Sequence, residues 1–208
     1  MKRINLDRWA RKDQYLFFKD FDEPFFGIAV EVDCTETVRH AKETGISLFL
    51  SYLHKSLEAA NRVEEFRYRI VQGEVMLYEE VHASAVIDRP NGTFGFSYID
   101  FHPDFETFRQ GAEEEIRRVQ QSTGLQAAVS GENVIHYSSI PWIRFTSLSH
   151  ARHYAYRDSC PKISFGKITP VNGKHLMPLS IHGHHALMDG RHVGQCIDEF
   201  QKLLNNPV

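Results

Sequence analysis

The sequence of 208 residues contains only three cysteines. Cys34, Cys160 and Cys196 are odd in number, lie far apart and form no C-x-x-C motif. Secreted domains usually carry even sets of cysteines for disulfides, and structural zinc sites usually need closely spaced ones. The sequence therefore argues against a disulfide framework and a structural zinc site, and it favours a reducing compartment.

Long apolar runs and a large charge imbalance are also missing. No stretch approaches the roughly 18 apolar residues that a membrane helix needs. The charged start of the chain, residues 1–8, is not followed by an apolar run, so we expect no signal peptide. The formal net charge is −3, with acidic and basic residues mixed, so no broad basic surface points to nucleic acid. We expect a cytoplasmic protein that binds neither nucleic acid nor membranes.

The apolar content is sufficient for a sizeable core. Hydrophobic residues make up 42% of the chain, and they include 15 Phe and 8 Tyr. No segment has the composition of a linker, and no internal repeat is present. Residues 1–208 are therefore expected to form a single domain.

Hydrophobic periodicity predicts a mixed order of helices and strands. Helices are expected at 35–43, 47–62, 104–121 and from 193 to the end, with Gly45 ending the first. Strands are expected at 15–18, 25–33, 66–71, 74–78, 82–87, 93–101, 134–137, 143–148, 162–169 and 175–183. Residues 122–133 are expected to form a loop. This order indicates an α+β fold, a two-layer sandwich of helices on a mixed, largely antiparallel sheet.

The most distinctive stretch is His184-His185-Ala186-Leu187-Met188-Asp189-Gly190, between a strand-like run and a helix-like one. Histidine titrates near neutral pH, so a well-placed one can take up and return protons. Along a strand, His182 and His184 would project to one face and His185 to the other. An Asp at this position is most often a helix N-cap. From these residues alone, the histidines could be catalytic, metal-binding or structural.

A metal site is one alternative for the histidine cluster. His182 and His184 would share a face, and His175 and His192 lie near them in the sequence. A catalytic zinc usually needs a third ligand, and the sequence contains no H-E-x-x-H or C-x-x-C motif. We therefore expect no metal.

Several segments together resemble the chloramphenicol acetyltransferase family, whose superfamily includes the dihydrolipoyl acyltransferases. Near the N-terminus, Trp9-Ala10-Arg11-Lys12 with Phe17-Phe18 resembles the family's W-x-R-R motif and aromatic pair, and Glu65-Phe66-Arg67 resembles its E-F-R motif. Pro141-Trp142-Ile143-Arg144-Phe145-Thr146-Ser147 resembles its P-W-x-x-F-x-S motif. His184–Gly190 matches its H-H-x-x-x-D-G motif, and Asp189-Gly190-Arg191-His192-Val193 matches its D-G-x-H-V motif. The similarity extends from about residue 7 to residue 204, in the family's order. The family's fold is the α+β sandwich expected above.

The resemblance implies an acetyl-CoA-dependent O-acetyltransferase, with chloramphenicol inactivation (antibiotic resistance) as the leading activity. His185 would be the general base that deprotonates the acceptor hydroxyl. Ser147 would donate a hydrogen bond to the oxyanion formed on the thioester carbonyl. Asp189 would have a structural role, held by an ion pair with Arg11. Ser147 as a nucleophile is a rival interpretation, but no G-x-S-x-G motif surrounds it.

The resemblance also assigns the remaining parts of the site. Ser164 would keep the family's hydroxyl near the reacting centre, and Lys167 would lie near the phosphate end of coenzyme A. Phe17, Phe18 and Phe25 would contribute to the acceptor pocket. The family forms homotrimers, and the catalytic histidine faces a pocket built by the neighbouring subunit.

The chain departs from the family pattern at three places. The family's other coenzyme-A lysine falls at Gly45, and Phe18 replaces a common tyrosine. Bulky residues occupy 24–27, where the family has a small residue. These departures leave open another hydroxylated small molecule as the acceptor, or a non-catalytic family member that only binds ligand. Metal-dependent hydrolysis by the histidine cluster is a third alternative.

Overall fold

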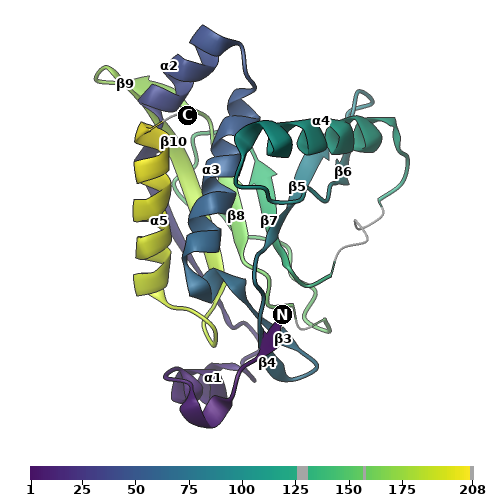
Figure 1. Ribbon diagram of the computed structural model, residues 1–208, viewed down its shortest axis with the longest axis vertical. Coiled ribbons are helices and arrows are strands. Elements are labelled where there is room, and N and C mark those ends of the chain that lie inside the picture. Colours follow the sequence, from purple (N-terminus) through teal and green to yellow (C-terminus); the bar gives the residue numbers. More distant parts are fainter. Residues whose placement is uncertain (126–130, 157, 207–208) are drawn as a thin grey trace.

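The computed structural model describes residues 1–125, 131–156 and 158–206 and has the predicted α+β architecture (Figure 1). The α-helices are α1 (Lys12–Phe18), α2 (Thr35–Thr44), α3 (Leu48–Arg62), α4 (Phe105–Gln121) and α5 (Gly190–Asn205). The strands are β1 (Lys2–Arg3), β2 (Phe25–Asp33), β3 (Tyr68–Val71), β4 (Glu74–Leu77), β5 (His82–Asp88), β6 (Phe94–Phe96), β7 (Val134–Ser139), β8 (Lys162–Phe165), β9 (Thr169–Val171) and β10 (Lys174–His184). Short 3-10 helices cover η1 (Leu6–Arg8) and η2 (Glu64–Arg67).

The described strands form a large mixed sheet and a small antiparallel one. The large sheet has the order β2-β10-β8-β7-β5-β6, with β9 paired to β10. The pairs β2–β10, β10–β8 and β5–β6 are antiparallel, whereas β7 runs parallel to both β5 and β8. The small sheet has the order β1-β4-β3. The predicted mixed, largely antiparallel sheet is confirmed.

Helix α3 forms the centre of the core because its apolar residues recur at helical spacing. Leu50, Leu53 and Leu57 lie on one face and are almost fully buried, and the Ser47 side chain caps the helix by accepting from the Leu50 amide. Burial of a leucine side chain contributes about 1.5–3 kcal/mol relative to leaving it exposed. These contacts fix α3 against the sheet beside α5.

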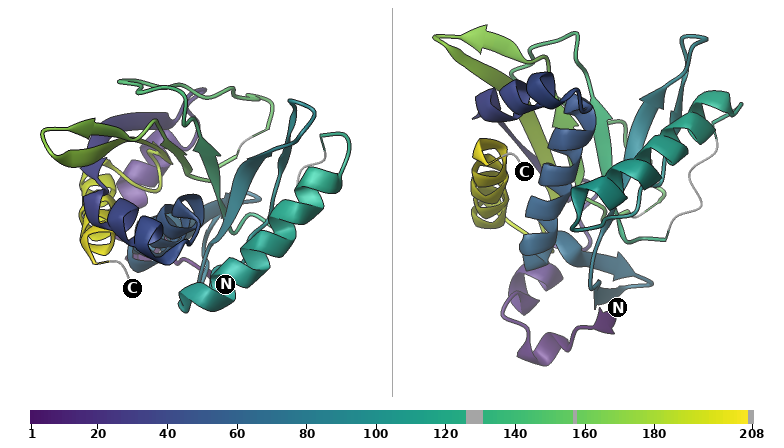
Figure 2. Two further views of the ribbon diagram at one scale, coloured as in Figure 1. Left: turned by 90° about the horizontal axis from the view of Figure 1, so that it is seen from above. Right: turned by 45° about the horizontal axis from the view of Figure 1, so that its top comes forward.

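The two faces of the large sheet have different coverings. In β2, Phe26, Ile28 and Val30 pack on the main core, so the residues between them face the other way. Helices α3 and α5 cover the core face, and the segment between β7 and β8 runs over the opposite face (Figure 2). We call this second side the loop-covered face. The Leu148 backbone there hydrogen-bonds the His182 side chain.

Two predicted strands are wrong. Residues 15–18 belong to helix α1, because Tyr15 and Phe18 lie one helical turn apart and both pack on a second apolar cluster. Residues 143–148 form a loop on the loop-covered face rather than a strand, and Ile143 is 57% exposed. Neither the aromatic content of residues 15–18 nor the local pattern of residues 143–148 therefore marked a strand.

Most other predicted elements are confirmed, with shifted ends. The predicted strand 162–169 is divided into β8 and β9, because the Gly166 amide donates to the Pro178 carbonyl and the Lys167 amide donates to the Ile143 carbonyl. The predicted strand 93–101 shortens to β6. The predicted loop 122–133 lies partly outside the described residues. Among the described helices, none combines the length and the apolar character required for a membrane span.

Candidate active site

The turn between β10 and α5, residues 185–189 of the H-H-x-x-x-D-G motif, is fixed by close packing. A Cβ atom on Gly183 would lie 2.3 Å from the Met188 sulfur, so only glycine lets the strand approach the turn this closely. Ala186 and Leu187 are fully buried, in one cluster with Tyr15 of α1. The turn and α1 are therefore held together, although they lie at opposite ends of the sequence.

An ion pair ties the same two segments. Arg11 Nη1 donates to Asp189 Oδ2 at 2.7 Å, and Arg11 Nη2 lies 3.4 Å from the His185 carbonyl oxygen. Asp189 also caps α5 by accepting from the Arg191 amide at 3.0 Å. Burial works to raise the pKa of Asp189, but the hydrogen bonds from Arg11 and Arg191 outweigh it and hold the pKa below its usual value. Asp189 is therefore a charged anchor for the turn.

A second network supports the first turn of α5. The Asp189 amide donates to His192 Nδ1 at 3.1 Å, which places the His192 proton on Nε2. His192 Nε2 lies 3.3 Å from Glu65 Oε1, so this contact links the helix start to η2. The E-F-R segment thus has a structural partner, which the sequence did not reveal.

The imidazole of His185 is oriented by aromatic packing. Its ring stacks on Phe18 with centroids 4.1 Å apart and planes at 7°, and the Phe26 ring lies 4.8 Å away. His185 Nδ1 is buried and has no hydrogen-bond partner among the described residues. Stacking and the turn together hold the ring in one orientation.

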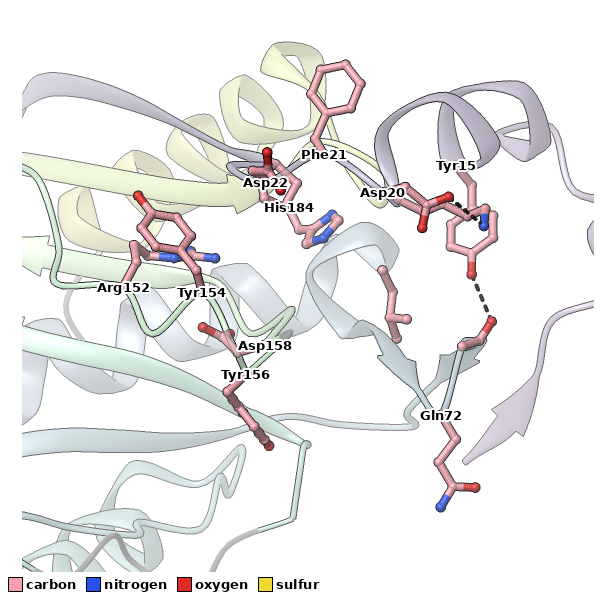
Figure 3. Close-up of a pocket in the computed structure, with 14 residues that line it drawn as sticks. Tyr15, Asp20, Phe21, Asp22, Gln72, Arg152, Tyr154, Tyr156, Asp158 and His184 are labelled. Carbon is pink, nitrogen blue, oxygen red and sulfur yellow. Dashed lines mark hydrogen bonds and ion pairs between the residues drawn. The ribbon is translucent and has the colours of Figure 1, made fainter.

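His184 lies on the opposite face of the sheet, as the alternation along the strand predicted. Its ring contacts Phe25, with centroids 5.3 Å apart, whereas His185 contacts Phe26. Burial, and to a lesser degree nearby charges, lower the pKa of His184 to about 4. The side chain lines a cavity of about 470 Å³ together with Arg152 and Asp158 (Figure 3).

Ser147, Ser164 and Lys167 belong to the loop-covered face. Ile163 and Phe165 point into the core, so Ser164 between them points away from it. Ser164 is fully buried, and its hydroxyl has no partner among the described residues. Ser147 and Lys167 are exposed. The structure therefore brings Arg11, Asp189 and His185 together but places the two serines on the other side of the sheet.

The three predicted acceptor aromatics are also separated. Phe18 contacts His185 on the core side, and Phe25 lies on the loop-covered face. Phe17 is 66% exposed and packs on Phe21. Gly45, the position of the family's lysine, is the left-handed C-cap of α2 with φ 74°, a conformation that favours glycine.

Sequence reasoning missed a cluster of polar side chains on the loop-covered face. Arg152 and Lys162 both lie over the Phe25 ring, at 3.6 and 4.5 Å from its centroid, and His150 packs edge-on against His182. Lys162 is paired with His182 across the antiparallel β8–β10 ladder. The alternation along β8 was the available signal, because it assigns Lys162 and Ser164 to one face.

One described group has metal-ligand chemistry. His136, Asp158 and Cys160 have ligand atoms within 4.8 Å of one another. Lys162 Nζ already donates to Asp158 Oδ2 at 2.8 Å, and the Cys160 amide donates to Asp158 Oδ1 at 2.8 Å. Burial raises the pKa of the Cys160 thiol, which opposes metal binding. The ion pair between Lys162 and Asp158 explains why these polar side chains lie close together, and no metal is needed to explain it.

The arrangement can perform acid–base chemistry at His185 and hydrogen-bond donation at the loop-covered face. A family model described as chloramphenicol acetyltransferase matches residues 1–201. A chloramphenicol acetyltransferase from Campylobacter coli is 29% identical over 98% of both chains, and one from Proteus mirabilis is 26% identical over 96% of this chain and 92% of that one.

The solved structures agree with the sequence comparisons. A structure named chloramphenicol acetyltransferase superimposes with a TM-score of 0.91 and 31% identity, covering 98% of this chain and 99% of that chain. The family model and this structure each cover nearly the whole chain. The chain belongs to the chloramphenicol acetyltransferase family.

Proposed function

We propose that this protein transfers an acetyl group from acetyl-CoA to a hydroxyl of a small molecule, with chloramphenicol as the leading acceptor. The observation that carries the proposal is the fixed imidazole of His185, stacked on Phe18 at 4.1 Å and supported by the Arg11–Asp189 pair at 2.7 Å. A general base must hold one orientation to accept a proton from a weakly acidic hydroxyl. Chloramphenicol is proposed as the acceptor because the relatives above are named chloramphenicol acetyltransferases.

The reaction is a direct transfer. His185 takes the proton of the acceptor hydroxyl as its oxygen attacks the thioester carbonyl carbon, and the carbonyl oxygen becomes an oxyanion. Ser147 donates a hydrogen bond to that oxyanion. The carbon–sulfur bond then breaks, the imidazolium returns its proton to the departing sulfur, and the products are the acetyl ester and free coenzyme A. No residue is acetylated on this route.

The two faces of the sheet support an active site built from two copies of the chain. His185 contacts Phe26 on the core side, whereas Ser164 lies on the loop-covered face and Ser147 is in the segment that covers it. Because His185 and Ser147 belong to different faces of the sheet, we propose that the two residues of one active site come from different copies of the chain. A second copy, with its loop-covered face against the His185 end of the first, would complete the site.

A homotrimer closes such head-to-tail contacts into a ring with three equivalent sites. Large apolar side chains are exposed both beside Phe18 at the His185 end and in the segment over the loop-covered face, among them Phe17 at 66%, Trp142 at 66% and Ile143 at 57%. A head-to-tail contact would bury apolar surface from both regions. Lys167 is exposed and free to meet the phosphates of coenzyme A.

Release of free thiol from acetyl-CoA in the presence of chloramphenicol tests the proposal. We expect steady thiol release by the wild-type protein, and a fall of about 10²–10⁴-fold in kcat for His185→Ala, because the base is removed. Gel filtration and circular dichroism of the variant establish that its assembly and fold are retained.

Each outcome separates the alternatives. Thiol release that His185→Ala leaves unchanged would eliminate the mechanism. Turnover with other hydroxylated acceptors but not with chloramphenicol would change the acceptor alone. A folded protein that binds acetyl-CoA and transfers to no hydroxyl would indicate a non-catalytic family member.

A further inference from the structure

A second, smaller cavity lies on the loop-covered face, close to the two serines. It has a volume of about 210 Å³, and its lining includes Phe25, His150, Arg152, Lys162 and His182. We call it the Arg152 pocket. Arg152 also lines the larger cavity beside His184, which Figure 3 shows, so it is common to the two cavities.

Arg152 is buried without a full set of partners. Its side chain is 13% exposed, and Nη1 is buried with no hydrogen-bond partner among the described residues. The nearest acidic atom is an oxygen of Glu23, 3.9 Å from Nε, which is too far for a hydrogen bond. The Phe25 ring holds the guanidinium in place at 3.6 Å. A buried guanidinium with an unused N–H is suited to bind an oxyanion.

His150 provides a second unused polar atom in the same pocket. Its Nε2 is buried and has no partner among the described residues, and its ring lies 4.7 Å from that of His182. Gly27 leaves room for His182, because a Cβ there would lie 2.4 Å from its Nε2. Burial, then the neighbouring His182 and Lys162, lower the pKa of His150 to about 4, so the ring is a neutral hydrogen-bonding group at neutral pH.

Lys162 adds positive charge to the wall of the pocket. Its side chain is 11% exposed, and Nζ lies 4.5 Å from the Phe25 ring centroid. Nζ is paired with Asp158, which belongs to the neighbouring cavity rather than to this one. Glu23 is the acidic residue in the lining of the Arg152 pocket, and it contacts Arg152 only at 3.9 Å.

The pocket adjoins the proposed reaction site. Ser149 lines it and lies two residues after Ser147, and Lys162 precedes Ser164 by two residues on the same face of β8. Residues two apart on a strand lie about 6–7 Å apart on one face. An acceptor that attacks a thioester whose carbonyl oxygen accepts from Ser147 would therefore have the Arg152 pocket within the length of a small molecule.

We propose that the Arg152 pocket binds a negatively charged group, a carboxylate or a phosphate, on the acceptor. The proposal rests on the acetyl-transfer function above and narrows its substrate class. An anion would accept hydrogen bonds from Arg152 Nη1 and His150 Nε2, which have no partner within residues 1–125, 131–156 and 158–206. Chloramphenicol carries no ionised group at neutral pH, so it would leave both atoms unpaired.

A matched set of acceptors tests this. The set is 3-hydroxy-3-phenylpropanoate, its uncharged primary amide, and 3-hydroxy-3-phenylpropyl phosphate, which share one secondary hydroxyl. We expect kcat/KM to be at least about tenfold higher for one of the two anions than for the amide, because a charged hydrogen bond is gained. Which of the two anions is preferred identifies the group.

Three variants assign the effect to the pocket. Arg152→Met keeps an apolar chain over Phe25. We expect this variant to raise KM for the anion about tenfold and to change KM for the amide about twofold or less. Arg152→Lys keeps the charge and should retain part of the preference. Arg144→Met is the control, because Arg144 lies in the same segment but pairs with Glu31 and is 44% exposed. It should leave the preference unchanged.

Binding without turnover separates this inference from the proposed function. The NMR signals of the His150 and His182 rings should shift with the anionic compounds and not with the amide, in wild type but not in Arg152→Met. Such shifts support the pocket even if no acceptor is acetylated. Equal kcat/KM for anion and amide with unshifted histidine signals would overturn the inference, and chloramphenicol turnover in the same protein would leave the proposed function standing.

Discussion

His184 and His185 are neighbours in the sequence, but they lie in different environments on opposite faces of the sheet. His185 lies between Phe18 and Phe26, on a turn that the Arg11–Asp189 pair holds in place. His184 is 4% exposed, touches Phe25 and lines a cavity that also contains charged side chains. A one-residue step along a strand reverses the side-chain direction, and this step separates a candidate base from a buried structural histidine.

The same comparison extends to the rest of each face. The His185 end has its supporting contacts within one chain, including the ion pair, the helix cap and the ring stack. On the loop-covered face, Ser164 Oγ, His150 Nε2 and Arg152 Nη1 lack partners among the described residues, and at the His185 end His185 Nδ1 and Arg11 Nε also lack them. Buried polar atoms are normally paired. We infer that both ends of the site are completed by ligands and by a second copy of the chain.

Removal of the Ser147 hydroxyl should produce the largest effect on the loop-covered face. We expect Ser147→Ala to lower kcat about 10²–10³-fold with little change in KM, because an oxyanion donor acts in the transition state. Stopped-time assays of thiol release measure this. Thr146→Ala is the matched control, since Thr146 is the neighbouring exposed hydroxyl residue and has no proposed role in the reaction or in the Arg152 pocket. Equal losses in the two variants would contradict the assignment.

A weaker loss is expected from loosening the His185 end. Arg11→Met removes the partner of Asp189, and the freed turn should lower kcat/KM by up to about 10²-fold through misplacement of the imidazole. It should also lower the free energy of unfolding by about 1–3 kcal/mol, toward the lower end because Asp189 is 36% exposed. Urea unfolding and acetyl-transfer kinetics measure the two effects. Arg8→Met, a change at a nearby exposed arginine, is the control and should alter neither.

The smallest expected effect concerns His184 and the pH dependence of stability. Its pKa is about 4 in the folded chain against 6.5 for an unperturbed histidine. The unfolded chain therefore takes up the proton first, so this contribution is fully present above pH 6.5 and is lost as the pH falls toward 4. The slope is at most about 1.4 kcal/mol per pH unit.

Urea unfolding at steps of about one pH unit between pH 7 and pH 4 measures how the free energy of unfolding changes with pH. His184→Gln should flatten that slope, whereas His153→Gln, a change at an exposed histidine of the same cavity-lining loop, should not. An identical slope in wild type and His184→Gln would show that the buried ring does not titrate on unfolding.

The fold was predictable wherever periodicity and turn chemistry agreed. Helix α3 has Leu50, Leu53 and Leu57 on one face and Ser47 as its cap, and the structure retains all of these features. Asn172-Gly173, a dipeptide typical of hairpin turns, joins β9 and β10 with positive φ angles of 49° and 80°. Local sequence determines such elements, and tertiary packing does not override it.

The two wrong strands show where local patterns fail. Residues 15–18 are rich in aromatics, which favour strands, but Tyr15 and Phe18 bury one helical face against the apolar cluster that also contains Leu187. Ile143 lies in a loop held by its carbonyl contact to the Lys167 amide. In both segments the partner that decides the structure is distant in sequence, so a local pattern could not identify it.

The candidate site was predictable only in part, for the same reason. The pairing of Arg11 with Asp189 followed from the family resemblance and is present at 2.7 Å. The Arg152 pocket could not be foreseen, because its residues come from β2, β8, β10 and a loop with no recognisable motif. Assembly of side chains from four segments is a property of the fold rather than of any one stretch of sequence.

The central claim is that one active site takes His185 from one copy and Ser147 from another, and mixed assemblies test it directly. His185→Ala and Ser147→Ala chains with different affinity tags are co-expressed, and assemblies with both tags are compared with each parent. If equal amounts of the two chains assemble at random into trimers, about three in four trimers contain both variants. Each of these mixed trimers has one intact site of its three. The unfractionated mixture should therefore regain about a quarter of the wild-type activity. A mixture of His185→Ala with the His185→Ala/Ser147→Ala double variant has no intact pairing and is the control. Activity in the first mixture no higher than the sum of its two parents would contradict the account.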